Sequence, residues 1–89
     1  MHIYFIREKG TKLYKIGRSN SPTRRLKELQ TSNPKKLELI CCIKGDSWLE
    51  TQIHHLFSYL KCEGGQEWFY ADTNMESYIQ KIKTIKVQL

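Results

Sequence analysis

Apolar and polar positions in the first half of the chain follow the pattern of short β-strands. His2–Arg7 and Lys12–Ile16 are rich in aromatic and β-branched residues, and a short turn containing Gly10 separates them. Two such runs joined by a short turn predict an antiparallel hairpin. Leu37–Lys44 is a third run, and its nearly continuous apolar character is typical of a strand covered on both faces. The first half therefore predicts a small antiparallel sheet.

Three further segments show helical periodicity. The first helix is expected from a Ser21 cap to about residue 31, the second from residue 46 or 47 to about 60, and the third from an Asn74 cap to about 86. The residues expected to face the core are Leu49, Ile53, Leu56, Phe57 and Leu60 in the second helix and Tyr78, Ile82 and Ile85 in the third. Between these two helices, Glu67–Tyr70 is a short aromatic segment, extended or in a tight turn. The pattern predicts one α+β domain over residues 1–89, with helices packed on a small antiparallel sheet.

The stretch from Tyr14 to Arg25 combines a strand end, a glycine, a polar loop and a helix start. Backbone N–H groups, the positive end of a helix and Arg side chains would then meet at one place, which suits a phosphate group. At 100° per residue, Leu29 lies about 40° from Arg25 and about 140° from Arg24, so Arg25 flanks the buried side and Arg24 points to solvent. The alternative interpretation is a surface turn followed by a solvated basic helix.

Charge is distributed unevenly along the chain. Residues 1–45 hold 11 Lys and Arg against 3 acidic residues, and residues 46–89 hold 4 Lys against 6 acidic residues, within a net charge of +6. A basic half favours a polyanionic partner, most simply nucleic acid, although a solvated basic face without a partner remains open. No stretch approaches the roughly 18 apolar residues of a membrane helix. Because the N-terminus begins directly in a strand pattern with no signal peptide, an intracellular protein is expected.

Several residue types in the sequence suit phosphodiester chemistry. Cutting such a bond needs charge neutralisation at the phosphate, a proton acceptor and, in many sites, a divalent ion held by a carboxylate. Arg18 and Arg25 are candidates for the charge and Glu50 for a hard metal ion. The candidate proton carriers are Tyr4, Tyr14 and His54. Glu50 and His54 are also four residues apart, as in an ordinary pair of neighbours on a helix surface.

At these residues the sequence resembles the GIY-YIG nuclease superfamily. The first motif, Gly-Ile-Tyr, is similar to His2-Ile3-Tyr4, and the second, Tyr-Ile-Gly, to Lys15-Ile16-Gly17. The arginine of the family follows the tyrosine position of the second motif by ten residues, which is Arg25 here. Glu50 matches the metal-binding glutamate early in the helix after the third strand.

The resemblance is closer to the phage and large-DNA-virus branch of DNA-binding proteins in this superfamily, and it covers about residues 2–70. The shared pattern consists of Lys15–Arg18, Arg25-Leu26, Leu49–His54 and a late Glu67–Phe69. It implies a three-stranded antiparallel sheet flanked by helices, in the order strand, strand, helix, strand, helix, helix. It also implies a phage or viral protein whose partner is DNA.

The activity implied by the resemblance is metal-dependent hydrolysis of a DNA phosphodiester. The residues implied to be catalytic are Tyr4 as proton carrier or phosphate contact, Lys15 at the tyrosine position, Arg25 for the phosphate and Glu50 for a single Mg²⁺ or Mn²⁺ ion. The residues implied to contact phosphate or DNA are Gly17, Arg18, Ser19, Arg24 and His54.

Lys15 leaves other functions open, because lysine is a cation at neutral pH, whereas the family has a tyrosine at this position. The first alternative is a module of the same fold that binds DNA with little or no cleavage, with Lys15 as a phosphate contact. The second alternative is a protein-interaction domain whose basic face is incidental.

Overall fold

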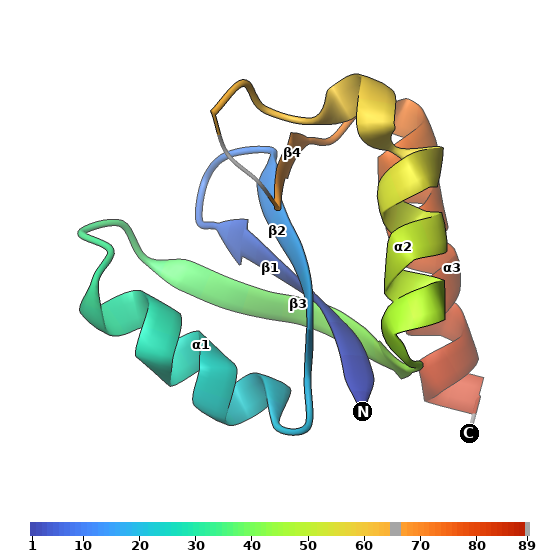
Figure 1. Ribbon diagram of the computed structural model, residues 1–89, viewed down its shortest axis with the longest axis horizontal. Helices are drawn as coiled ribbons and strands as arrows, with labels where there is room; N and C mark the ends of the chain where they lie inside the picture. The colour runs from blue at the N-terminus through green and yellow to red at the C-terminus, as the bar shows by residue number, and fades with distance from the viewer. Residues whose placement is uncertain (65–66, 89) are drawn as a thin grey trace.

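The computed structural model describes residues 1–64 and 67–88, with side chains described as far as Ile85, and it has the predicted α+β architecture (Figure 1). Its elements are β1 (His2–Glu8), β2 (Leu13–Ser19), α1 (Pro22–Thr31), β3 (Leu37–Lys44), α2 (Ser47–Leu56), the short 3₁₀ helix η1 (Ser58–Leu60), β4 (Trp68–Tyr70) and α3 (Thr73–Gln88). The hairpin, the third strand and the first helix form where the sequence pattern predicted them, but β2 does not end at Ile16. It continues through Gly17 to Ser19, so Arg18 and Ser19 belong to the strand and not to a loop, because their backbone pairs with β1. Part of the turn expected before Glu67 lies at residues 65 and 66, outside the described residues.

The sheet is antiparallel with strand order β3-β1-β2-β4, so it holds a fourth strand beyond the three that were expected. The segment left open as extended or turned is β4, which pairs with Leu13–Lys15 of β2. Its pairing with β2 ends at Lys15, whereas β2 continues to Ser19. Among the described residues, the second half of β2 is therefore paired with β1 on one side and with no strand on the other.

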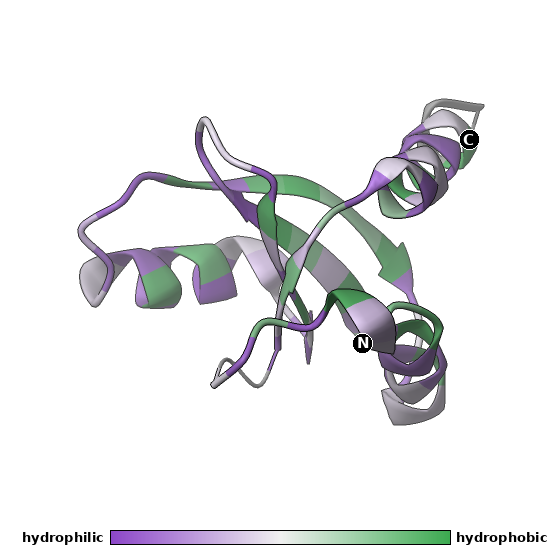
Figure 2. Cartoon of the chain, turned by 90° about the horizontal axis from the view of Figure 1, so that it is seen from above, coloured by the Kyte–Doolittle hydropathy of each residue, from purple (hydrophilic) through white to green (hydrophobic). Residues whose placement is uncertain are grey.

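Helices cover both faces of the sheet. Helix α1 lies on one side, whereas α2 and α3 lie together on the other (Figures 1 and 2). The larger core joins α2 and α3 to the sheet through Ile3, Phe5, Ile16, Ile53 and Phe69, among others. The smaller core lies under α1 and centres on Tyr4, Ile6 and Leu37. Figure 2 shows the hydrophobic residues concentrated in the strands between the helices.

The helix boundaries follow from local capping. The Ser21 side chain accepts a hydrogen bond from Arg24 N, with Pro22 in the first turn, as predicted. Asp46 caps α2 by accepting from Trp48 N and Leu49 N.

Three details of the later helices differ from the prediction. Asp72 rather than Asn74 caps α3, because its carboxylate accepts from Met75 N. Helix α2 ends at Leu56 rather than near Leu60, because the chain tightens into η1 there. Leu56 was expected to face the core but is 54% exposed. Ile85 is also exposed rather than buried, since it lies beyond the last turn of α3 that packs on the sheet. In the described part of the chain, no helix has the length and apolar character needed to cross a bilayer.

Candidate functional site

The site is built on a close approach between Tyr4 and Gly17, which face each other across β1 and β2. Tyr4 is 1% exposed, and a Cβ atom on Gly17 would overlap its hydroxyl and ring carbon atoms. The absence of a side chain at Gly17 therefore lets the tyrosine ring extend from β1 over the backbone of β2. This places the Tyr4 hydroxyl at the half of β2 that β4 does not cover.

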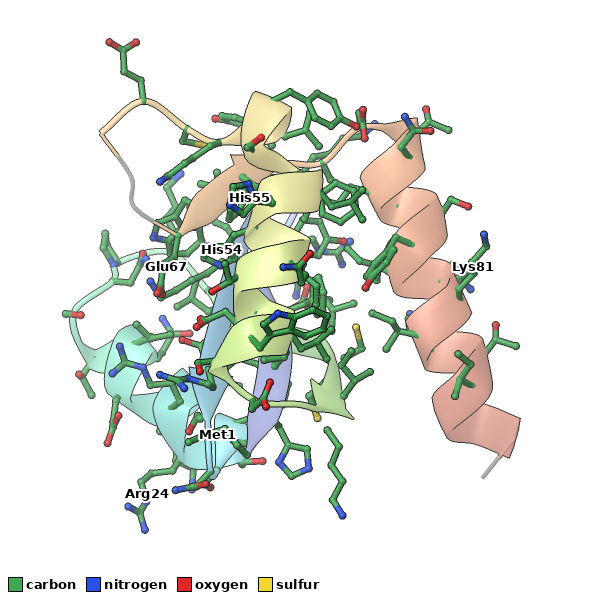
Figure 3. The ribbon with its side chains drawn as sticks, turned by 45° about the vertical axis from the view of Figure 1, so that its right-hand side comes forward. Met1, Arg24, His54, His55, Glu67 and Lys81 are labelled. Atoms are coloured by element: carbon green, nitrogen blue, oxygen red, sulfur yellow. The ribbon has the colours of Figure 1, made fainter. Side chains whose placement is uncertain are left out.

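Helix α1 brings Arg25 to the Tyr4 hydroxyl, to which its guanidinium donates a hydrogen bond. A second donated bond joins Arg25 Nη1 to Glu28 Oε1 at 3.3 Å. Both bonds favour the charged guanidinium and raise the pKa of Arg25, the bond to Tyr4 contributing most. Arg24 points away on the exposed side of α1 (Figure 3). The structure thus brings Arg25 and not Arg24 to the site.

Tyr4 is held in its protonated form. Burial is the main cause that raises its pKa, and the nearby Glu67 and Glu50 carboxylates raise it further. The hydrogen bond from Arg25 acts in the opposite direction and is outweighed. A tyrosine with a pKa above its usual value of about 10 stays neutral at physiological pH and can donate a hydrogen bond.

Helix α2 supplies Glu50 from its first turn. Its carboxylate lies 3.7 Å from Arg18 Nε, and the Glu50 side chain is 17% exposed. Arg18 is on the same strand as Gly17 and is itself exposed. The charge of Glu50 also contributes to raising the pKa of Tyr4, after burial and Glu67.

His54 closes part of the same edge. Its Nε2 atom lies 2.8 Å from the carbonyl oxygen of Ile16, and since a carbonyl can only accept, Nε2 carries the hydrogen. The ring also packs edge-on against Phe69 of β4, with centroids 5.1 Å apart. Glu50 and His54 therefore each bond a different group on β2, and His54 Nε2 is engaged with the backbone rather than directed to a phosphate.

Lys15 occupies the position of the motif tyrosine and is held by Trp68, the first residue of β4, and by Glu67 just before it. Its Nζ atom lies 3.1 Å from Glu67 Oε1 and 5.6 Å from the centroid of the Trp68 ring. Only 12% of the Lys15 side chain is exposed. Glu67, labelled in Figure 3, is the residue of the site that the sequence did not single out. The available signal was the Glu67–Phe69 motif itself.

Two other expected residues have partners other than the Tyr4 hydroxyl. Tyr14 is buried in the larger core on the opposite face of the sheet, beneath the Arg7 guanidinium, so it is not placed beside Tyr4. The Ser19 hydroxyl accepts a hydrogen bond from Ser21 N at 3.0 Å. Ser19 thus shapes the loop that leads into α1.

The donor groups restrict which metal the site could hold. Among the described residues, no cluster of three or more His, Cys, Asp and Glu side chains is arranged to bind an ion. Mg²⁺ and similar ions are commonly held by only one or two carboxylates, with water and substrate phosphates completing the shell. The partly exposed Glu50 carboxylate fits that pattern, whereas a metal ion held by protein ligands alone does not.

The contact between Tyr4 and Gly17 yields a stability prediction. Gly17→Ala is expected to lower the free energy of unfolding by about 1–3 kcal/mol, because the new methyl group forces the buried tyrosine or the strand to move. The melting temperature should fall by roughly 4–8 °C for each kcal/mol. Thermal melts followed by circular dichroism measure this change. In a Tyr4→Leu background the same substitution should cost less, and an equal cost in both backgrounds would contradict the explanation.

Comparison with known proteins identifies the family of the chain. A family model described as the T5orf172 domain matches residues 1–86. Neither the curated proteins nor the solved structures contain a significant match. Because the family match spans nearly the whole sequence, the chain belongs to the T5orf172 domain family, a phage-associated domain of the endonuclease-related group.

Proposed function

We propose that this protein is a DNA endonuclease of the GIY-YIG type that hydrolyses phosphodiester bonds with the help of a divalent metal ion. The observation that carries the proposal is the convergence of Tyr4, Arg25 and Glu50 from β1, α1 and α2 around the uncovered half of β2. Membership in a nuclease-related domain family and the basic first half of the chain support it. Since the proposed substrate is DNA, we also propose that the protein acts inside a cell.

Each residue of the site has a role that follows from its chemistry. Arg25 and the protonated Tyr4 hydroxyl are adjacent donors, so together they can bind a non-bridging phosphate oxygen and stabilise the negative charge that grows there. Lys15 and Arg18 lie on either side of Gly17 in the sequence and would add positive charge along the path of the DNA backbone. Glu50 would hold a Mg²⁺ or Mn²⁺ ion, which when bound supplies electrophilic stabilisation of the phosphate and the leaving oxygen.

The ion pair of Lys15 favours one alternative function. Lys15 is a cation held by Glu67 and by the face of Trp68, and a phosphate can bind it by competing with Glu67. A module with this cation in place of the motif tyrosine could bind DNA through its backbone and cut it slowly or not at all. Nicking and binding are therefore measured separately.

The direct test is nicking of supercoiled plasmid. The protein is expected to convert plasmid to the open-circular form in the presence of Mg²⁺ or Mn²⁺ and to stop when a chelator is added, because Glu50 alone offers too few ligands to retain the ion strongly. Nicking is followed on agarose gels over time. No nicking with either ion, together with tight DNA binding, would favour the binding module.

Salt dependence tests the DNA partner itself. Binding to a short duplex should weaken by about a hundredfold between roughly 50 and 200 mM salt for four neutralised phosphates, because bound cations release counterions from DNA. Fluorescence anisotropy at several salt concentrations gives the slope. A flat response would exclude phosphate-driven binding and would favour a protein-interaction domain.

A further inference from the structure

We propose that Glu67 is the proton acceptor for the attacking water and that Lys15 holds its carboxylate in place until a phosphate competes for the lysine. The proposal rests on the nuclease function proposed above and assigns a further catalytic residue to that site. It is carried by the position of Glu67, its partner and the chemistry of its neighbours.

The backbone places Glu67 firmly at the site. Its carbonyl oxygen accepts a hydrogen bond from Ile16 N at 3.0 Å, while the Ile16 carbonyl accepts from His54 Nε2 at 2.8 Å. Glu67 therefore meets β2 one residue before Gly17, at the point where β4 leaves the strand. Its side chain is 38% exposed, so solvent reaches a carboxylate whose backbone is fixed.

Two carboxylates lie near enough to the Tyr4 hydroxyl to act on it through their charge, and they have different partners. Glu50 pairs with Arg18, and Glu67 pairs with Lys15. Both raise the pKa of Tyr4 through their charge, Glu67 more strongly than Glu50. If Glu50 binds the metal ion, its carboxylate is not available to accept a proton. Glu67, which pairs with Lys15, is then the carboxylate that can accept it.

The residues at the two motif positions do not take up a proton themselves. A lysine ammonium has donors and no acceptor. Burial raises the pKa of Tyr4, which favours the protonated hydroxyl, a hydrogen-bond donor. Tyr4 and Lys15 thus bind negative charge, and the Glu67 carboxylate beside both of them accepts the proton.

The step balances without any further reagent. A phosphate oxygen draws the Lys15 ammonium to itself, and a water molecule takes its place at the Glu67 carboxylate. The water oxygen forms a bond to phosphorus as one of its O–H bonds breaks, and that proton passes to Glu67. The bond from phosphorus to the leaving oxygen breaks, this oxygen keeps the electron pair and takes a proton from solvent, and Glu67 later returns its proton to solvent.

The test compares Glu67→Gln with Glu63→Gln, a matched change at an exposed glutamate of the same loop. The amide of Glu67→Gln still accepts a hydrogen bond from Lys15 but is a very weak base, so nicking should fall by about 10²-fold or more. Duplex binding should stay within about threefold of wild type or become tighter, because a negative charge is lost near the phosphate. Glu63→Gln should nick and bind like wild type.

Rescue distinguishes a proton acceptor from a positioning residue. Glu67→Ala should lose nicking to a similar extent and regain part of it with increasing formate, measured against chloride at equal ionic strength. Glu50→Ala should gain nothing from formate. A loss in Glu67→Ala that formate does not restore would make Glu67 a positioning residue for Lys15 and overturn the proposal.

The remaining outcomes separate this inference from the proposed function. Nicking by Glu67→Gln within about threefold of wild type would overturn the inference and leave the endonuclease in place, since an essential general base contributes more than that. No nicking by the wild-type protein with either metal ion would overturn both.

Discussion

Arg25→Ala is expected to slow plasmid nicking by about 10²–10³-fold, the loss that follows removal of one donor to a developing oxyanion. The guanidinium donates to the Tyr4 hydroxyl and acts on it through its positive charge, so its removal takes away both charge and orientation. Single-turnover nicking with protein in excess over plasmid measures the chemical step without product release.

Arg24→Ala is the matched control, because it removes the same charge from the neighbouring residue on the exposed side of α1. It should weaken DNA binding slightly and leave the single-turnover rate within a few-fold of wild type. Arg25→Lys should fall between the two, since an ammonium keeps the charge but not the planar fork of donors. Equal losses in Arg24→Ala and Arg25→Ala would contradict the assignment.

Glu50→Ala should have the largest effect on nicking, about 10³-fold or more. Electrophilic stabilisation by a metal ion contributes several kcal/mol to such reactions, and each 1.4 kcal/mol corresponds to about tenfold in rate. Glu50 is the carboxylate of α2 whose charge acts on Tyr4, and its loss removes the proposed metal ligand. Nicking rates at increasing Mn²⁺ concentrations measure both the rate and the apparent metal affinity.

Glu76→Ala is the control for this change. Glu76 also lies in the first turn of a helix and also forms an ion pair, with Lys12, but on α3. It should leave nicking and its metal dependence unchanged. Glu50→Ala should still bind duplex DNA at least as well as wild type in the absence of metal, because a negative charge is removed. Wild-type nicking by Glu50→Ala would exclude Glu50 as the ligand.

Much of the fold is encoded in local patterns, which explains why the sequence predicted it. The β1–β2 hairpin follows from two alternating runs around a Gly-containing turn, and α1 follows from the Ser21-Pro22 start. Helical geometry alone was enough to separate Arg25 from Arg24, because the buried side of α1 is defined by nearby leucines. Such features depend on residues within one or two turns of each other.

The remaining features depend on contacts between distant segments. β4 has only three residues, and it is a strand because β2 offers it an edge. The pairing of Lys15 with Glu67 joins residues far apart in the chain, and neither charge indicates its partner from the sequence. His54 was a candidate proton carrier by residue type, but the carbonyl of Ile16, which no local pattern reveals, determines its role in the structure.

The early end of β4 also bears on how the protein behaves at high concentration. An uncovered strand edge is a template on which another chain can pair, and proteins limit this with charge or by occupying the edge. Here the Arg18 side chain adds charge at that edge, and His54 occupies the Ile16 carbonyl. The same groups that shape the site therefore also protect β2 against aggregation. The solubility of any variant that removes one of these side chains should be checked before its activity is interpreted.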